Sequence, residues 1–234
     1  STQAKTLFPY TTLFRSASRP FCRCWFACAS CFGSRENLID SMKITSDHWL
    51  EGVKRDLIPG GSAMPVRRFL VIHFTSGASA QSSINFWKTP AAKGASAHIV
   101  IDRDGTVYQC RPFNVTAGHA GVSQWQGFKG LNACSIGIEL ANAGDNVALA
   151  ARWSKFEPVT AKHKNGSKPQ KWEVYPPEQL AACEEIAKAL VARYKLDDVI
   201  GHEDIAPDRK NDPGPAFPMA ALRVACGFKP EVKP

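Results

Sequence analysis

The sequence has no apolar run approaching the roughly 20 residues that a membrane-spanning helix needs, so we predict no membrane span. Acidic residues are in the minority, since 21 Asp and Glu stand against 29 Lys and Arg, a formal net charge of +8. A basic protein suits acidic partners such as nucleic acid, a bacterial cell wall or anionic lipid. The basic residues are scattered and form no run with interleaved aromatics, which argues against a nucleic-acid partner.

Cysteine is scarce outside one short cluster. The chain has eight cysteines, and four of them fall within residues 22–31. A zinc site is one interpretation of the cluster, but its spacing C-x-C-x3-C-x2-C lacks the two C-x2-C pairs of a zinc ribbon. The other four are widely spaced, and we expect buried thiols rather than a disulfide framework at Cys110, Cys134, Cys183 and Cys226.

The first part of the chain differs from the rest. It mixes Arg with Phe and Trp without helical or strand periodicity, and Ala4–Ser16 (AKTLFPYTTLFRS) resembles a translated sequencing adapter. A signal peptide is an alternative, although its apolar stretch is short and is interrupted by Arg23. We expect a non-native or disordered segment at 1–41, a lead-in at 42–65, one domain at 66–228 and a tail at 229–234.

Three short runs of β-branched, apolar or small residues predict buried strands. They are Arg68–Phe74, Ser135–Leu140 and Val199–His202. His73 lies near the end of the first run, and Glu139 lies near the end of the second. A buried strand rarely carries a charged side chain without a reason, so these two residues are candidates for a functional role.

The remaining segments predict a hairpin, helices and a loop. Two β-rich runs at 96–101 and 106–110 flank Asp102–Gly105, which is typical of a hairpin. Residues 142–175 are polar, and we expect a long loop there. Apolar spacing and proline positions predict helices at 81–88, 177–195 and 218–226. This order of elements indicates an α/β fold with a central mixed β-sheet flanked by helices.

The residue types indicate a candidate metal site. His73 and His202 both follow buried apolar runs, and Asp212 lies in a loop that several prolines stiffen. Such a loop loses little entropy when it folds back to present a carboxylate. A catalytic zinc takes three protein ligands from imidazole, carboxylate or thiolate and keeps one position open for water. Two distant histidines are usually unrelated, so these residues alone only suggest the site.

Five local strings add to this indication. They occur in the order VIHFTSG, SAHIVIDRDGTVYQ, AGHAG, NACSIGIEL and GHEDIAPDRKNDPGPAFP. Together they resemble the zinc-dependent N-acetylmuramoyl-L-alanine amidases of the amidase-2 type, which are related to peptidoglycan recognition proteins. The resemblance covers about residues 66–228, and the last string is the most specific. It implies a single domain of that fold and one bound Zn²⁺.

The resemblance also implies roles for individual residues. His73 in VIHFT matches the first zinc ligand, His202 in GHEDIAP the second and Asp212 in RKNDPGP the third. Glu139 in SIGIEL matches the general base, and Lys210 in DRKND matches the residue that stabilises the charged intermediate. Glu139 would take a proton from the attacking water, and Lys210 would place a cation where an oxyanion develops.

The other histidines match no ligand position of the family. We expect His98 and His119 to orient the ligands or to stabilise the fold rather than to bind metal. We expect His48 and His163 to be exposed.

Contacts with substrate are less specified. Asn132 lies where family members often contact the muramyl or peptide portion, and Arg209 would face a carboxylate of the stem peptide. Ala97 stands where many relatives carry a Tyr, so we expect the chemistry to rely on Glu139. Gly118 stands where many carry a Trp, which leaves an aromatic wall in question. Core and cleft positions are both open for Trp87, Trp125, Trp153 and Trp172.

The resemblance implies hydrolysis of the amide between N-acetylmuramic acid and the L-alanine of the stem peptide. The rival is a non-catalytic peptidoglycan-binding module of the same fold, and the competent residues at all three ligand positions favour catalysis. A structural zinc domain would need a fourth ligand, and no other residue matches a ligand position.

The substrate is either polymeric peptidoglycan or soluble anhydro-muropeptide. The basic segment 142–175 suits the polymer. If translation begins at Met42, no export signal follows, which predicts a cytoplasmic protein. The alternatives are a phage-encoded lysin or an enzyme exported to the envelope. The sequence does not predict an oligomeric state.

Overall fold

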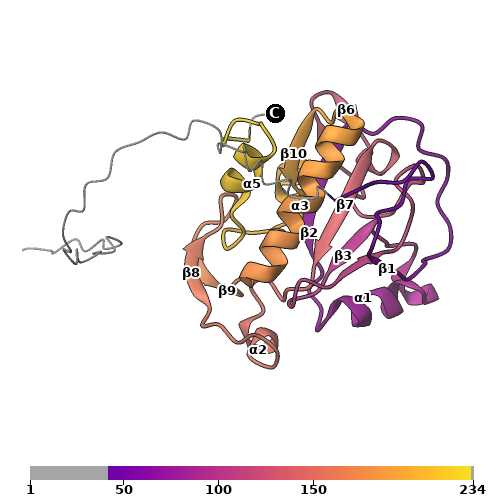
Figure 1. The fold of residues 1–234 in the computed structure, drawn as a ribbon. Coiled ribbons are helices and arrows are strands. Elements are labelled where there is room, and N and C mark those ends of the chain that lie inside the picture. Colours follow the sequence, from indigo (N-terminus) through magenta and orange to yellow (C-terminus); the bar gives the residue numbers. More distant parts are fainter. Residues whose placement is uncertain (1–41, 233–234) are drawn as a thin grey trace, which may run out of the picture. The chain divides into compact units, whose positions relative to one another are not determined.

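Six strands form one mixed β-sheet at the centre of the fold (Figure 1). The computed structural model describes residues 42–232. The strand order is β1-β4-β3-β7-β2-β10, and β3 and β4 form the antiparallel pair of this sheet. The strands are β1 (Lys54–Arg55), β2 (Phe69–Phe74), β3 (Ile99–Ile101), β4 (Val107–Gln109), β7 (Ser135–Leu140) and β10 (Asp198–Gly201). The predicted mixed sheet and the predicted hairpin are confirmed.

Strands β2, β7 and β10 are buried along their whole length. Parallel strands covered on both faces are usually continuous apolar runs. His73 and Glu139 depart from that rule, because both are polar and both are buried near the ends of their strands. Burying a polar group costs free energy unless it finds a partner, so their surroundings decide what they do.

Helix α3 (Pro177–Tyr194) lies across one face of the sheet (Figure 1). It packs there with α5 (Met219–Ala225), and Ile186 and Leu222 from these helices share a core cluster with Ile72 of β2. Burial of each such side chain contributes roughly 1.5–3 kcal/mol to folding. This layer holds the strand ends in register.

The opposite face is covered by shorter elements. Phe69 and Val71 of β2 point to this side and pack with Trp125 and Leu131. Helix α1 (Ala80–Trp87) covers the neighbouring strand β3. Outside residues 142–175, the other short elements are η1 (Pro90–Ala92), β5 (Gln124–Trp125), β6 (Phe128–Lys129), η2 (Leu131–Ala133) and α4 (His202–Ile205).

The three predicted helices are confirmed to within one residue at each end. Helix α3 begins with Pro177, where a missing N–H costs nothing, and ends before Lys195. Lys195 adopts a left-handed conformation with φ of 53°, and its N–H donates to the carbonyl of Val191. This is the usual way in which a helix satisfies its last carbonyls.

The predicted loop at 142–175 is more ordered than expected. It contains α2 (Val147–Ala150) and the antiparallel hairpin β8–β9, with β8 at Val159–Lys162 and β9 at Pro169–Trp172. The apolar and polar alternation that identifies a half-buried strand is missing, because most hairpin residues are exposed. The backbone ladder therefore forms without a pattern that the sequence could reveal.

The lead-in at 42–65 is part of the folded domain. Residues 42–65 contribute β1 to the sheet and place Leu50 and Met64 in the core. The four cysteines of the described residues are free thiols, as predicted. Cys110 and Cys183 are buried, but Cys134 and Cys226 are only half-buried, so the predicted burial is wrong for these two. No helix among residues 42–232 is long and apolar enough to span a bilayer. The cysteine cluster at 22–31 lies outside the described residues.

Candidate metal centre

Three parallel strands end at the same edge of the sheet. Strand β2 pairs with β10 on one side and with β7 on the other. The register places His73 opposite Glu139, and Gly201 opposite Ile72. His202 directly follows Gly201, so it emerges beside His73. Sites in α/β proteins gather at this carboxyl-terminal edge, because the chain leaves the sheet there as loops.

Asp212 reaches the same place from the loop that follows α4. The backbone N–H of Glu203 donates to the carbonyl of Asp212 at 2.8 Å. The hydroxyl of Tyr175 donates to the carbonyl of Pro213, also at 2.8 Å. These two bonds fix the backbone that directly follows the Asp212 side chain and hold it near the strand ends.

The three side chains meet at nearly equal distances. Nδ1 of His73 lies 2.9 Å from Nδ1 of His202, and each Nδ1 lies 3.0 Å from Oδ2 of Asp212. All three residues are buried, with 1%, 2% and 5% of their surface exposed. Within residues 42–232 they form a group whose ligand atoms are close enough together to hold one metal ion.

The second ring nitrogen of each histidine has its own partner. Nε2 of His202 lies 3.1 Å from the carbonyl of Ala120, which can only accept, so His202 carries its proton there. Nε2 of His119 likewise donates to the carbonyl of Ser135 at 3.3 Å. His119 therefore accepts at Nδ1 from Nε2 of His73, at 3.0 Å. Both remaining Nδ1 atoms, in His73 and His202, direct lone pairs at the centre of the cluster.

Three acceptor atoms, Nδ1 of His73, Nδ1 of His202 and Oδ2 of Asp212, thus face one another, and none of them carries a proton to donate. Burial and the neighbouring His202 lower the pKa of His73 to about 4, so its ring is neutral at pH 7. Two neutral imidazoles and one carboxylate are the protonation states that metal ligands require. A cation at the centre would relieve their mutual repulsion.

Glu139 lies beside this cluster, next to His73 in the register of β2 and β7. It is 9% exposed, and its Oε2 atom has no hydrogen-bond partner among the described residues. Burial and the charge of Asp212 raise the pKa of Glu139 to about 8, and Lys210 opposes them. A cation bound beside it would lower this pKa again, and an ionised carboxylate free of hydrogen bonds on one oxygen is suited to accept and return a proton.

A cavity of about 420 Å³ opens onto the cluster. Its wall includes Glu139, His202 and Asp212 together with Lys210 and Trp87. Trp87, Phe74 and a few small residues supply the apolar part of the wall, and the rest is polar. The cavity therefore combines aromatic surface with charged groups that could orient a polar ligand.

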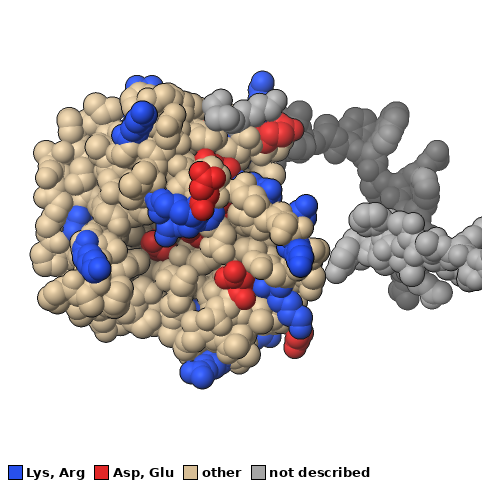
Figure 2. Space-filling view, turned by 180° about the vertical axis from the view of Figure 1, so that it is seen from behind, with Lys and Arg blue, Asp and Glu red and all other residues tan. Residues whose placement is uncertain are grey.

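A larger hollow of about 1200 Å³ adjoins the cavity. It lies between the β5–β6 hairpin and α4, and it shares Gly121 and Arg209 with the smaller cavity. On the face drawn in Figure 2, Lys and Arg side chains lie next to Asp and Glu side chains around a central hollow.

The structure gives the two predicted substrate contacts different positions. Oδ1 of Asn132 accepts from the backbone N–H groups of His119 and Ala120, at 3.0 and 2.7 Å. Asn132 therefore fixes the segment that supports both histidines of the cluster. Arg209 lines the cavity, and its Nε donates to the carbonyl of Val122 at 3.0 Å.

Two histidines lie away from the three-residue cluster in different ways. His98 is buried, donates from Nε2 to the carbonyl of Val115 at 2.9 Å and accepts at Nδ1 from the N–H of Gly137 at 3.0 Å. His48 is half-buried, and its Nδ1 lies 2.8 Å from the hydroxyl of Tyr194.

The prediction that His48 and His163 are exposed was wrong, because His48 is half-buried and His163 is buried. His163 is 6% exposed, and its Nε2 lies 2.5 Å from Oε2 of Glu203. The β8–β9 hairpin folds this residue inward, although the surrounding string AKHKNGSKPQK looks fully polar. Nothing in the local sequence singles out Glu203, except that it adjoins His202.

The tryptophans divide between core and surface. Trp125 and Trp172 are buried, and Trp153 is 36% exposed. Trp87 ends helix α1 and lines the cavity. The aromatic residues in this wall therefore come from α1, with Trp87, and from β2, with Phe74, and not from the position of Gly118.

The site and the fold agree with a known family. A sequence model of the family described as N-acetylmuramoyl-L-alanine amidase, the amidase-2 family, matches residues 62–215. The chain belongs to this family. The matched segment contains every residue of the cluster as well as Glu139 and Lys210.

Individual relatives support the same assignment. N-acetylmuramoyl-L-alanine amidase AmiD of Escherichia coli is 35% identical over 171 residues, which are 69% of this chain and 54% of that protein. The 1,6-anhydro-N-acetylmuramyl-L-alanine amidase AmpD of Escherichia coli is 40% identical over 131 residues, 55% of this chain and 57% of that protein. This chain thus spans little more than half the length of these relatives.

A solved structure shares the fold. It is AmiD from E. coli in complex with the substrate anhydro-N-acetylmuramic acid-L-Ala-D-γ-Glu-L-Lys. It is 29% identical, gives a TM-score of 0.55 and covers 81% of this chain and 67% of that one. The single α/β domain predicted from the sequence is confirmed.

Proposed function

We propose that this protein hydrolyses the amide between N-acetylmuramic acid and L-alanine, with one Zn²⁺ held by His73, His202 and Asp212. The observation that carries the proposal is the triangle of three buried acceptor atoms, 2.9–3.0 Å apart, with no donor between them. Membership of the amidase family and the names of AmiD and AmpD support the reaction.

The donor set fits zinc. Zn²⁺ takes imidazole nitrogen and carboxylate oxygen at about 2.0–2.2 Å in a tetrahedral arrangement, which places ligand atoms about 3.3 Å from one another. The triangle is slightly tighter than this and would open by a few tenths of an ångström. Two histidines with one carboxylate are a known catalytic set that leaves a fourth position free. When bound, the ion would supply Lewis-acid chemistry, acidifying water and polarising the substrate carbonyl.

Glu139 acts as the general base. Its unpartnered carboxyl oxygen accepts a proton from the attacking water and later returns it to the departing amine of L-alanine. Lys210 lines the same cavity, and its charge acts on both Glu139 and His73. It stabilises the negative charge that develops on the carbonyl oxygen. These two residues divide the proton transfer and the charge stabilisation between them.

The neighbouring residues orient the ligands and the substrate. His119 accepts from His73 and so fixes the ring whose Nδ1 faces the ion. Asn132 acts through the backbone of residues 119 and 120 rather than on the substrate. Trp87 offers an aromatic face to the apolar side of the muramyl ring, and Arg209 stands at the cavity edge as a cation for a stem-peptide carboxylate.

Polymeric peptidoglycan is the substrate form that the surface favours. Within residues 152–171, Glu157 is the single acidic residue, and all six basic residues are exposed. Lys164 forms ion pairs, whereas no ion pair within residues 42–232 involves Arg152, Lys155, Lys162, Lys168 or Lys171. Basic side chains also lie on the right of Figure 2, which corresponds to the left of Figure 1, where β8 and β9 are drawn. Such a surface attracts an anionic polymer.

The deciding experiment measures zinc content and product together. Purified protein loaded with Zn²⁺ is incubated with soluble anhydro-muropeptide, and the free amine of the released L-alanyl peptide is quantified. We expect one ion per chain and loss of both ion and turnover after chelation. Binding of muropeptide without release of amine would instead identify a non-catalytic recognition module.

The substrate form needs a separate comparison between intact sacculi and soluble anhydro-muropeptide. We expect faster cleavage of sacculi at low salt, reduced at high ionic strength. Gln substitutions in the hairpin should reduce only the activity on sacculi, and the variant carries them at Lys162, Lys168 and Lys171. The matched control carries the same change at Lys188, Lys195 and Lys229. Equal effects of the two variants would exclude the hairpin as a polymer contact. Faster cleavage of soluble anhydro-muropeptide than of sacculi would instead identify soluble fragments as the substrate.

A further inference from the structure

The β8–β9 hairpin presents one buried histidine to the loop that carries the metal ligands. His163 follows β8 and stacks on Trp172 of β9, with ring centroids 5.7 Å apart and an angle of 27° between the rings. Its Nδ1 accepts from the N–H of Asn165 at 3.1 Å. The proton of the neutral ring is therefore on Nε2, which donates to Oε2 of Glu203 at 2.5 Å.

Glu203 is bonded to both sides of the cluster. It directly follows His202, and its own N–H donates to the carbonyl of Asp212 at 2.8 Å. Its Oε2 also accepts from the N–H of Gly214 at 3.2 Å. The same carboxylate that receives the proton of His163 therefore fixes the backbone on the far side of Asp212.

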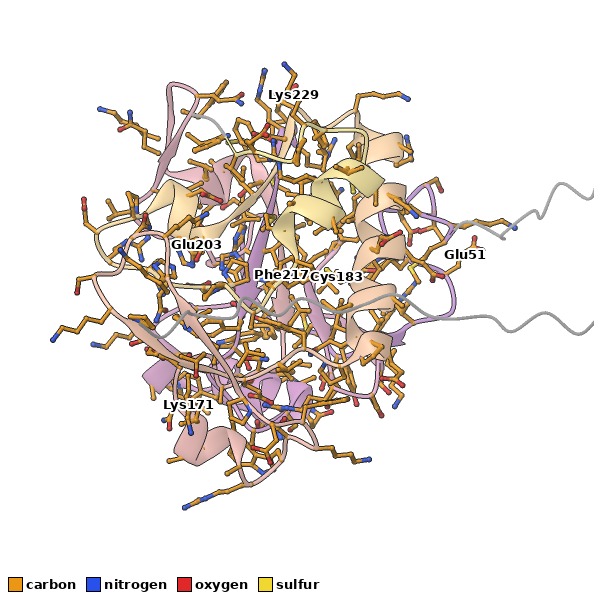
Figure 3. All side chains as sticks on the ribbon, turned by 90° about the vertical axis from the view of Figure 1, so that its left-hand side faces the viewer. Glu51, Lys171, Cys183, Glu203, Phe217 and Lys229 are labelled. Carbon is orange, nitrogen blue, oxygen red and sulfur yellow. The ribbon has the colours of Figure 1, made fainter. Side chains whose placement is uncertain are left out.

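The hairpin also packs directly on this loop. Gly214 has φ of 73°, and a Cβ at this position would lie 2.8 Å from the ring of Trp172. The side-chain amide of Asn165 donates to the carbonyl of Glu203 at 3.0 Å. Figure 3 draws Glu203 inside the molecule and Lys171 of β9 near its edge, so the hairpin reaches from the surface to the loop.

Neither His163 nor Glu203 has a direct role in the proposed chemistry. They do not line the cavity that contains Glu139 and Lys210. Glu203 is nevertheless a buried carboxylate, 6% exposed, and a buried charge persists only where several donors surround it. His163, Gly214 and Lys164 supply those donors, the last at 2.9 Å from Oε1.

We propose that His163 is a positioning residue that acts through Glu203 to hold His202 and Asp212 in their metal-binding geometry. The hairpin then serves the metal centre on its inner side. The inference rests on the proposed metal site but not on the hydrolytic reaction. Groups that orient metal ligands typically change affinity about 10- to 100-fold when removed.

The test compares His163→Leu, which removes the donor but keeps the bulk, with His163→Gln, which keeps a neutral donor. Zinc affinity is measured by competition with a chelator, and the absorption spectrum of the Co²⁺-substituted protein reports the geometry of the site. We expect His163→Leu to bind zinc about 10- to 100-fold more weakly and to shift the Co²⁺ bands. His163→Gln should recover most of the affinity. At saturating zinc we expect His163→Leu to lower kcat and leave KM unchanged.

The control is His48→Leu, which removes a half-buried histidine with a single hydroxyl partner far along the chain. It should lower thermal stability without changing zinc affinity. Equal zinc affinity in His163→Leu and the parent protein would overturn the proposal, as would an equal loss in the His48→Leu control.

Two further results keep the outcome unambiguous. If His163→Leu does not fold, Glu203→Gln removes the acceptor charge while keeping its shape, and we expect weaker zinc binding there too. Parent protein that binds zinc but releases no amine would refute the hydrolase and leave the positioning role standing. Parent protein that hydrolyses substrate while His163→Leu keeps full zinc affinity would refute the positioning role alone.

Discussion

His73 and Glu139 are register partners on the adjacent parallel strands β2 and β7. Neighbouring strands lie about 4.8 Å apart, and paired residues direct their side chains to the same face. The proposed base therefore stands beside a proposed ligand through the sheet itself and not through a loop. Strand β10 adds His202 in the same way, one residue beyond its pairing with β2.

Replacement of Glu139 by Gln tests this arrangement most directly. We expect kcat to fall by at least about 10²- to 10⁴-fold, because Gln cannot take the proton of water. The bound zinc should be unchanged, because Glu139 is not a proposed ligand. Thermal stability should not fall, since a buried carboxyl near Asp212 is already unfavourable when charged. Amine release and metal content are measured on the same sample, with Glu184→Gln on exposed α3 surface as the control. Turnover near that of the parent would remove Glu139 from the mechanism.

Metal removal should destabilise the protein. An ion that binds only the folded state adds about 4 kcal/mol to the free energy of unfolding when its free concentration is 1000 times Kd. Chelation would also leave three buried acceptors facing one another. Urea unfolding of metal-free and zinc-loaded protein measures the difference. In Asp212→Ala the zinc-dependent increment should disappear, and an increment that survives there would place the ion elsewhere.

Gly137→Ala tests the support behind His73. A Cβ at Gly137 would lie 2.5 Å from Cγ of His119, whose ring packs on the sheet at this point. Such overpacking typically costs about 1–3 kcal/mol. Displacing His119 would also free Nε2 of His73, so we expect weaker zinc binding together with lower stability. Chemical denaturation and chelator competition measure the two effects. A variant with normal zinc affinity would mean that His119 does not orient the ligand.

The strands and helices that place this site were predictable, because their residues carry a periodic apolar pattern. His73 and Glu139 were found because charged side chains interrupt such runs. The resemblance of local strings then indicated which distant residues belong together. His202 and Asp212 meet His73 because β10 pairs with β2 and because the loop after α4 folds back to the strand ends. Neither contact can be read from a local stretch of sequence.

The hairpin and its contacts were not predictable in the same way. Most of β8 and β9 is exposed, so no alternation marked them as strands. His163 looked like one more polar residue in a basic loop, and only the fold brings it to Glu203, forty positions along the chain. Buried polar pairs of this kind depend on tertiary contacts, and such contacts leave no periodic pattern in the sequence.

Trp87 is expected to contribute to substrate binding and not to chemistry. It lines the cavity next to the proposed metal ligands, whereas Trp153 is exposed in the segment 142–175. We expect Trp87→Ala to raise KM for anhydro-muropeptide about 10-fold, because an aromatic contact is worth roughly 0.5–1.5 kcal/mol beyond the lost buried area. The value of kcat should change little. Trp153→Ala is the matched control with soluble substrate, and an unchanged KM in Trp87→Ala would exclude the wall contact.

His98 should make the fold sensitive to acid. Burial lowers the pKa of His98 to about 4, against an unfolded value of 6.5, while the hydrogen bond to Val115 opposes the shift. The unfolded state therefore binds more protons between pH 6.5 and pH 4, and stability falls as pH decreases through this window. Above pH 6.5 the contribution of His98 is fully present, and below about pH 4 it has been lost. The difference amounts to about 3 kcal/mol.

His98→Gln isolates that contribution, because Gln does not titrate and retains one donor and one acceptor for Val115 and Gly137. We expect the variant to be less stable than the parent at pH 7 but to lose about 3 kcal/mol less between pH 7 and pH 4. Urea unfolding of metal-free protein measures both, which removes proton competition at the metal ligands. The buried His73 titrates similarly in both proteins and cancels in the comparison, whereas loss of the His98 charge also removes part of the lowering of the His119 pKa. Parallel pH profiles would show that His98 is not the group that couples folding to acid.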